Sequence, residues 1–174
     1  MSRTALFALL AALACRSSGA SRAPAEGELE VSWRDSSHAV ALRAPANAHW
    51  CARDSLLELL AVSHDTGLGL LLLARDSLRP DSFPVFQGGV FAPWRPQASA
   101  ALRALSASDI KGYTSTWGVV KLSTIAAKRV SGSFDLHVKL TPGKDTLHLT
   151  GSFTRVLVAP ATLPCGRANP PKTP

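Results

Sequence analysis

Apolar and polar residues alternate without a break from Val130 to Leu140. The even positions carry Val, Gly, Phe, Leu, Val and Leu, and the odd positions carry Ser, Ser, Asp, His and Lys. Successive side chains of a β-strand point to opposite faces of its sheet, so this pattern is typical of a strand with one buried and one wet face. A chain with this segment is expected to build a sheet that covers a core on one side.

A second alternating run, from Thr146 to Thr154, follows the turn sequence Pro142-Gly143-Lys144-Asp145. The two runs predict an antiparallel hairpin in residues 130–157. With a four-residue loop, Thr141 pairs with Thr146, and all the apolar side chains stay on one face. This register places the ring of Phe134 opposite the ring of Phe153.

Other segments have the composition of strands. Leu56–Ser63 and Leu68–Arg75 flank a His-Asp-Thr-Gly turn, and we expect a central hairpin that is buried on both faces. Residues 98–111 fit a helix or a strand, and a strand is favoured. Further strand candidates are Glu28–Trp33, His38–Arg43 and Trp117–Ile125.

Turn signals recur about every ten residues, which is the spacing of all-β sandwiches and barrels. Hydrophobic residues make up 46% of the chain and charged residues 18%, which is enough apolar material for a packed core. We therefore predict one antiparallel β-sandwich domain in residues 28–163. A small lipocalin-like barrel is the alternative.

The amino terminus resembles a bacterial lipoprotein signal. An apolar run, Ala5–Ala14, follows Arg3 and is too short to span a bilayer, which takes about 20 residues. It ends in Ala-Ala-Leu-Ala-Cys, which is similar to the lipobox that precedes a lipid-carrying cysteine. The resemblance implies a signal peptide in residues 1–14 and lipidation of Cys15. An ordinary signal peptide cut at Ala14 or Ala20 is the alternative.

Residues 15–27 are rich in Ser, Ala, Gly and Pro and are expected to form a flexible tether behind the lipid. Acyl chains on Cys15 would hold the domain at a membrane without a transmembrane helix. Arg16 replaces the Asp that retains lipoproteins in the inner membrane, so a cell with an outer membrane would carry the protein there, on the periplasmic face or the cell surface. A soluble secreted or periplasmic protein is the other possibility.

The two remaining cysteines, Cys51 and Cys165, are predicted to form a disulfide, because export leads to an oxidising compartment. The bond would tie the Pro-rich tail, residues 164–174, back onto the early part of the domain. Free, buried thiols are the alternative.

The later half of the chain is similar to a loose group of bacterial lipoproteins with a single β-rich domain. The resemblance rests on Ser82–Val85, Tyr113–Leu122, Val130–Phe134 and Leu149–Phe153, and covers roughly residues 56–158. It implies a β-rich fold and an envelope address, and it carries no activity, because the group has none assigned.

The sequence contains no motif for a catalytic nucleophile, a structural metal or a bound nucleotide. In the predicted register, His137 and His148 are diagonal neighbours on the polar face, near Asp135. These three are compatible with a weak metal or acid/base cluster, but a solvated sheet face is favoured. We therefore predict no catalytic residues, no metal and no cofactor.

Aromatic side chains gather in Phe83–Pro96, where glycines and prolines discourage regular structure. Phe86, Phe91 and Trp94 would form a partner surface if they were exposed. If covered, they would plug one end of the domain.

The formal net charge is +7, but the basic residues are scattered, and we expect no nucleic-acid partner. The sequence favours a monomeric, membrane-anchored protein with a non-catalytic binding or envelope-structural role, whose partner is an envelope protein or ligand. A carrier of a small apolar ligand is the first alternative, and an enzyme with a site built from distant loops is the second.

Overall fold

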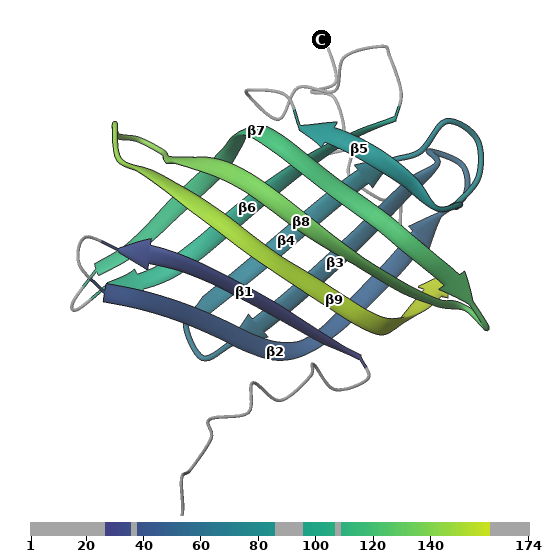
Figure 1. Cartoon of the computed structure of the whole chain (residues 1–174), viewed down its shortest axis with the longest axis horizontal. Coiled ribbons are helices and arrows are strands. Elements are labelled where there is room, and N and C mark those ends of the chain that lie inside the picture. Colours follow the sequence, from purple (N-terminus) through teal and green to yellow (C-terminus); the bar gives the residue numbers. More distant parts are fainter. Residues whose placement is uncertain (1–26, 36–37, 86–95, 107–108, 161–174) are drawn as a thin grey trace, which may run out of the picture.

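The computed structural model describes residues 27–35, 38–85, 96–106 and 109–160, which form nine β-strands and no helix (Figure 1). No segment in these ranges is a helix long and apolar enough to cross a membrane. The all-β prediction is confirmed. The strands are β1 (Glu28–Asp35), β2 (His38–Cys51), β3 (Leu56–Ser63), β4 (Thr66–Leu73), β5 (Asp81–Val85), β6 (Gln97–Ser106), β7 (Asp109–Ala126), β8 (Arg129–Leu140) and β9 (Thr146–Pro160).

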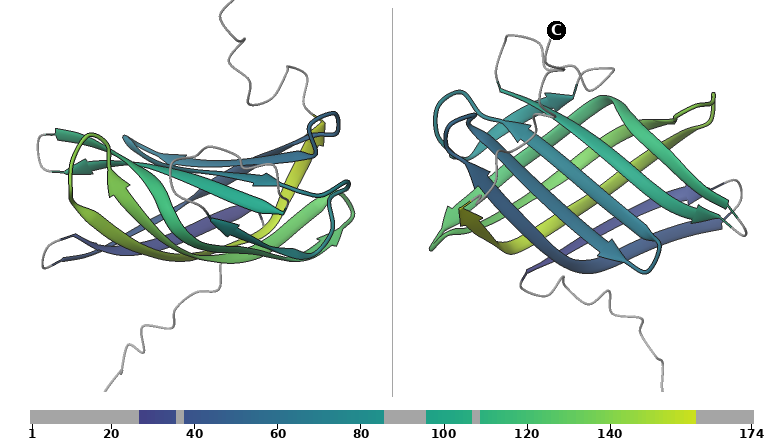
Figure 2. Two further views of the ribbon diagram at one scale, coloured as in Figure 1. Left: turned by 90° about the horizontal axis from the view of Figure 1, so that it is seen from above. Right: turned by 180° about the vertical axis from the view of Figure 1, so that it is seen from behind.

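The strands form one sheet that closes on itself in the order β1-β2-β3-β4-β6-β5-β7-β8-β9. Figure 2 shows that the closed sheet is flattened, with β1, β9, β8 and β7 in one wall and β3, β4 and β6 in the opposite wall. The architecture is therefore a barrel, the alternative that the sequence left open, and not two separate sheets.

Closure depends on strands that exchange partners along their length. β9 pairs antiparallel with β1 and then parallel with β2, where Ala48 lies beside Val158. β7 pairs first with β6 and then with the short strand β5. Where β6 and β7 separate, the Ser115 hydroxyl accepts a hydrogen bond from the backbone N–H of Ala100 (2.9 Å) and supplies the acceptor that the ladder lacks there.

The interior of the barrel is filled by side chains that point inward from every strand. The largest fully buried apolar ones are Phe83, Phe153, Leu29, Leu57, Leu59, Leu68, Leu70, Leu72, Leu102, Leu136 and Leu149. They belong to a single hydrophobic cluster that runs through the barrel. At about 25 cal/mol per Å² of apolar surface buried, a core of this kind is the main source of the fold's stability.

The predicted C-terminal hairpin is confirmed as β8 and β9, but its predicted register is wrong by two residues. Lys139, not Thr141, pairs with Thr146, and the backbone N–H of Leu140 donates to the carbonyl of Asp145 (2.8 Å). The loop is therefore longer than the turn sequence suggested. From Gly132 to Lys139 the slip is by two residues, so every side chain there stays on its predicted face while its partner changes. A bulge after Val130 ends this agreement, and beyond it Val156 is buried while Leu157 is 53% exposed.

The central hairpin is confirmed as β3 and β4, joined through His64 and Asp65, but it is not buried on both faces. Leu60 and Val62 are each 52% exposed on the outside of the barrel. A closed barrel has its core on one side only, so the side chains on the outer face of this leucine-rich hairpin remain in contact with solvent. The favoured strand at 98–111 is confirmed for β6 and for the start of β7.

Candidate functional site

Three rings are stacked in a row on the outer face of β7, β8 and β9. The ring of Trp117 lies on that of His137, with centroids 3.6 Å apart and planes 11° apart. The ring of His137 lies on that of His148, at 4.5 Å and 14°. The corrected register produces this row, because it pairs Trp117 with His137 and His137 with His148 directly across the strands.

A β-bulge turns Trp117 onto this row. Ser115 pairs with Val138 and Trp117 with His137, so Thr116 is an extra residue in β7. Its hydroxyl donates to the carbonyl of His137 (3.1 Å). An extra residue reverses the alternation of a strand. Ser115 is therefore buried, whereas Trp117 is 58% exposed.

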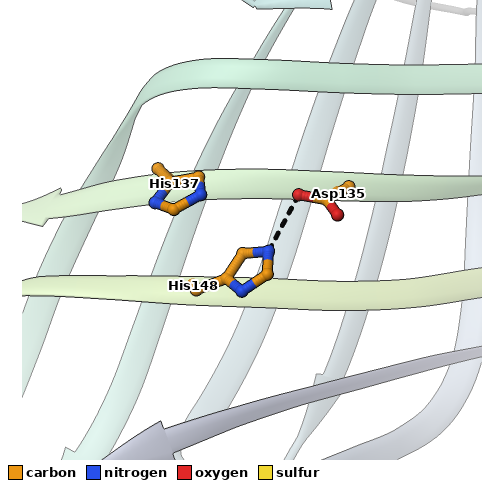
Figure 3. Close-up of side chains that lie close together, drawn as sticks. All are labelled: Asp135, His137 and His148. Carbon is orange, nitrogen blue, oxygen red and sulfur yellow. Dashed lines mark hydrogen bonds and ion pairs between the residues drawn. The ribbon is translucent and has the colours of Figure 1, made fainter.

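Asp135 completes the cluster from the position two residues before His137 on β8. The Nε2–H of His148 donates to Oδ1 of Asp135, at 2.8 Å (Figure 3). Both side chains are about half exposed, so this contact adds little to stability, about 0–1 kcal/mol. Its main effect is to fix the orientation of the His148 ring.

The environment of His137 favours its neutral form. Its pKa is lowered from the usual 6.5, first because the side chain is partly buried, and second because His148 is close. The carboxylate of Asp135 acts in the opposite direction and raises the pKa. Neutral imidazole offers a lone pair to a metal ion or a proton.

The donor atoms of Asp135, His137 and His148 all lie within 4.8 Å of one another. Figure 3 shows one nitrogen of each ring on the side that faces Asp135. Two imidazoles and one carboxylate are donors that bind zinc and related ions. The predicted diagonal arrangement of the histidines is corrected, since they are direct neighbours across the two strands.

A second candidate site is an apolar groove on the outer surface of the opposite wall, across β2, β3, β4 and β6. Its volume is about 920 Å³, and a smaller hollow of about 480 Å³ adjoins it at the β3–β4 turn. The outward residues of the groove include Leu60, Leu71 and Ala101, with Asn47, His49 and Thr114 at its polar edges.

Small residues make this outer surface concave. Gly67 and Gly69 occupy the outer phase of β4, and Ala101 lies beside Gly69 on β6. The larger side chains of Leu60 and Val62 stand on β3 next to them. The result is an exposed apolar hollow of a kind that often contacts a ligand or a partner.

Ser63, His64 and Asp65 follow one another at the β3–β4 turn but do not form a catalytic triad, because Asp65 contacts Arg103 and not His64. The Ser63 hydroxyl and Nδ1 of His64 are 3.1 Å apart at the β3–β4 turn. The carboxylate of Asp65 forms an exposed ion pair with Arg103 at 4.0 Å. His64 has a positive φ of 54°, which is typical of a turn residue.

Several residues singled out from the sequence lie outside the described ranges. They are Cys15, Phe86, Phe91, Trp94 and Cys165, together with the signal, the tether up to residue 26 and the tail. Cys51 is described, and its side chain is buried against Leu56 and Leu73. The disulfide therefore stays a prediction.

Sequence reasoning missed the role of Trp117 and the groove. Trp117 lies on the same face of β7 as the exposed residues Lys121 and Ser123. A tryptophan among the solvent-facing residues of a strand could have indicated a functional surface. The groove could have been suspected only from Gly67 and Gly69, two small residues that alternate with leucines in this strand.

Comparison with known proteins gives no relative for this chain: no family model, no curated protein and no solved structure matches it.

Proposed function

We propose that the chain is an exported lipoprotein, anchored in a membrane of the bacterial cell envelope through Cys15, whose barrel is a non-catalytic binding module. The anchor rests on the resemblance of Ala11–Cys15 to a lipobox and on the tether that follows. The binding role is supported by one observation above all, the apolar groove across β3, β4 and β6.

The groove suits an apolar segment of a partner in the envelope. Leu60 and Val62 expose apolar side chains that solvation alone does not favour, and Gly69 beside Leu60 has no side chain that would fill the groove. The polar edge formed by Asn47, His49 and Thr114 could pair with the partner's backbone.

A carrier of a small apolar ligand remains the alternative. The packed leucines and phenylalanines inside the barrel leave the groove as the more favourable place for such a ligand. A ligand there would be open to solvent on one side, which suits a surface contact better than long-range transport.

The test compares two pairs of exposed apolar residues. Leu60→Asp with Val62→Asp alters the groove, while Leu105→Asp with Ile110→Asp changes a pair of similar exposure, 50% and 49%, that does not line it. Each chain is crosslinked in the native host, and the captured proteins are quantified by mass spectrometry. Native mass spectra of the purified chains detect a retained small molecule.

The proposal requires a component that the wild type and the control variant both retain and the groove variant loses. Loss of a small molecule of constant mass, instead of a protein, would indicate the carrier. If the groove variant retains everything that the wild type retains, the groove is not the binding surface.

A further inference from the structure

We propose that Asp135, His137 and His148 form a binding site for a divalent transition-metal ion of the zinc or copper type. The site lies on the wall of β7, β8 and β9, opposite the wall of β3, β4 and β6 (Figures 2 and 3). It depends neither on the groove nor on the lipid anchor.

The sheet itself brings the three ligands together. Residues 135 and 137 are two apart on β8 and share the outer face, while His148 lies directly across from His137 on β9. Directly opposite side chains have Cβ atoms about 4.5–5.5 Å apart, which is within reach of one ion. The inward neighbours Leu136 and Leu149 are completely buried, so the strands beneath the site are held by the core.

Small side-chain rotations are enough to complete the coordination. The donors lie within 4.8 Å of one another, whereas zinc–ligand bonds of about 2.0–2.2 Å in a tetrahedron place donors about 3.3–3.6 Å apart. The His148 ring must tilt out of its stack on His137, which its half-exposed position permits. A water molecule would supply the fourth ligand.

The contact between His148 and Asp135 shows how the site changes on binding. Without an ion, the Nε2–H group of His148 donates a hydrogen bond to Oδ1 of Asp135. To bind the ion through Nε2, the neutral ring must carry its proton on Nδ1 instead, and the carboxylate then becomes a ligand or a partner of the bound ion.

The donor set predicts which ions bind. Imidazole prefers copper and zinc, whereas magnesium and calcium require mainly oxygen ligands. Copper should bind more tightly than zinc, as it does at most sites of this type. Calcium at the same concentration should not compete.

Trp117 provides a direct reporter. Its ring is stacked 3.6 Å from that of His137, so a copper ion at the site should quench its fluorescence. The purified full chain, carrying a tag without histidine, is titrated with CuCl₂ and ZnCl₂ and followed by fluorescence and calorimetry. We expect one saturable site per chain.

The variants His137→Gln and His148→Gln should each weaken binding by at least tenfold, since even the loss of an outer partner of a metal ligand costs about 10–100-fold. His38→Gln is the matched control, an exposed histidine at the start of β2 that lies outside both the cluster and the groove. Trp117→Phe should lose most of the quenching and keep the calorimetric binding.

Circular dichroism and thermal melts establish that each variant is folded, as expected for side chains on the outer face of the barrel. Three results would overturn the proposal: no saturable binding of copper or zinc, binding that survives in the double variant of His137 and His148, or equal competition by calcium.

Discussion

The ring of Phe134 on β8 packs over Gly151 on β9, directly across the strand pair. A Cβ atom at Gly151 would overlap the backbone carbonyl oxygen of Glu30 on β1 as well as Cζ of that ring, and would come within 2.8 Å of Cε2. The relationship is reciprocal, because Phe153 packs over Gly132 in the same way. The two rings therefore occupy space that only glycine leaves open, and they lock the register of the hairpin.

Replacing Gly151 should destabilise the fold. Gly151→Ala should lower the free energy of unfolding by about 1–3 kcal/mol, the usual range for overpacking a core. Gly112→Ala is the control, because a Cβ there meets no atom within 4 Å. Urea denaturation measures both. Equal stability of the two variants would contradict the close packing of Gly151 against the Phe134 ring and the Glu30 backbone.

The predicted disulfide between Cys51 and Cys165 would close a loop of roughly a hundred residues, for which chain entropy gives up to about 4.7 kcal/mol. Cys51→Ala and Cys165→Ala should then destabilise the chain similarly, and the double variant should cost little more than either. A reducing agent should remove most of the difference. If Cys165→Ala is neutral while Cys51→Ala is costly, Cys51 is instead a packed residue without that bond.

The lipid anchor predicts incorporation of a palmitate analogue. The wild-type chain should carry the label and fractionate with membranes, while Cys15→Ala should lose the label, because no other cysteine follows the lipobox-like sequence. Cys51→Ala should keep it. A label that persists in Cys15→Ala would exclude the anchor, and an unlabelled wild type would favour an ordinary signal peptide.

The free energy of unfolding should depend on pH through His137. Its pKa lies below 6.5 in the folded chain, so the unfolded chain binds the proton first as the pH falls. The contribution of this residue to stability is complete above pH 6.5 and decreases below it, until the pH reaches the folded pKa. Imidazole NMR titration with a chelator present should give a midpoint below 6.5. His148→Gln should raise that midpoint, and Asp135→Asn should lower it.

The loop aromatics remain a separate prediction. Phe91→Ser with Trp94→Ser should abolish capture of a partner and leave the melting temperature unchanged if these side chains form a contact surface. A large fall in melting temperature would indicate that they plug one end of the domain.

The candidate metal site could be predicted only in part from the local sequence pattern. Asp135, His137 and His148 are on one face because alternation requires it, and this was predicted from the sequence. Their direct apposition was not, because the turn sequence predicted a register that differs by two residues from the observed one. Trp117 lies beside them only because of the bulge at Thr116, and the local sequence pattern does not predict that bulge.

The sequence by itself determined that the chain is all-β and which phase of β8 and β9 faces the core. Those properties depend on the period of two along each strand, which is local. Only the tertiary structure decided the register and the closure. A two-residue slip leaves the same faces buried, so it is decided by contacts such as Phe134 over Gly151. Closure requires β9 to meet β1 and β2, more than a hundred residues away, and no local pattern encodes which distant edges pair.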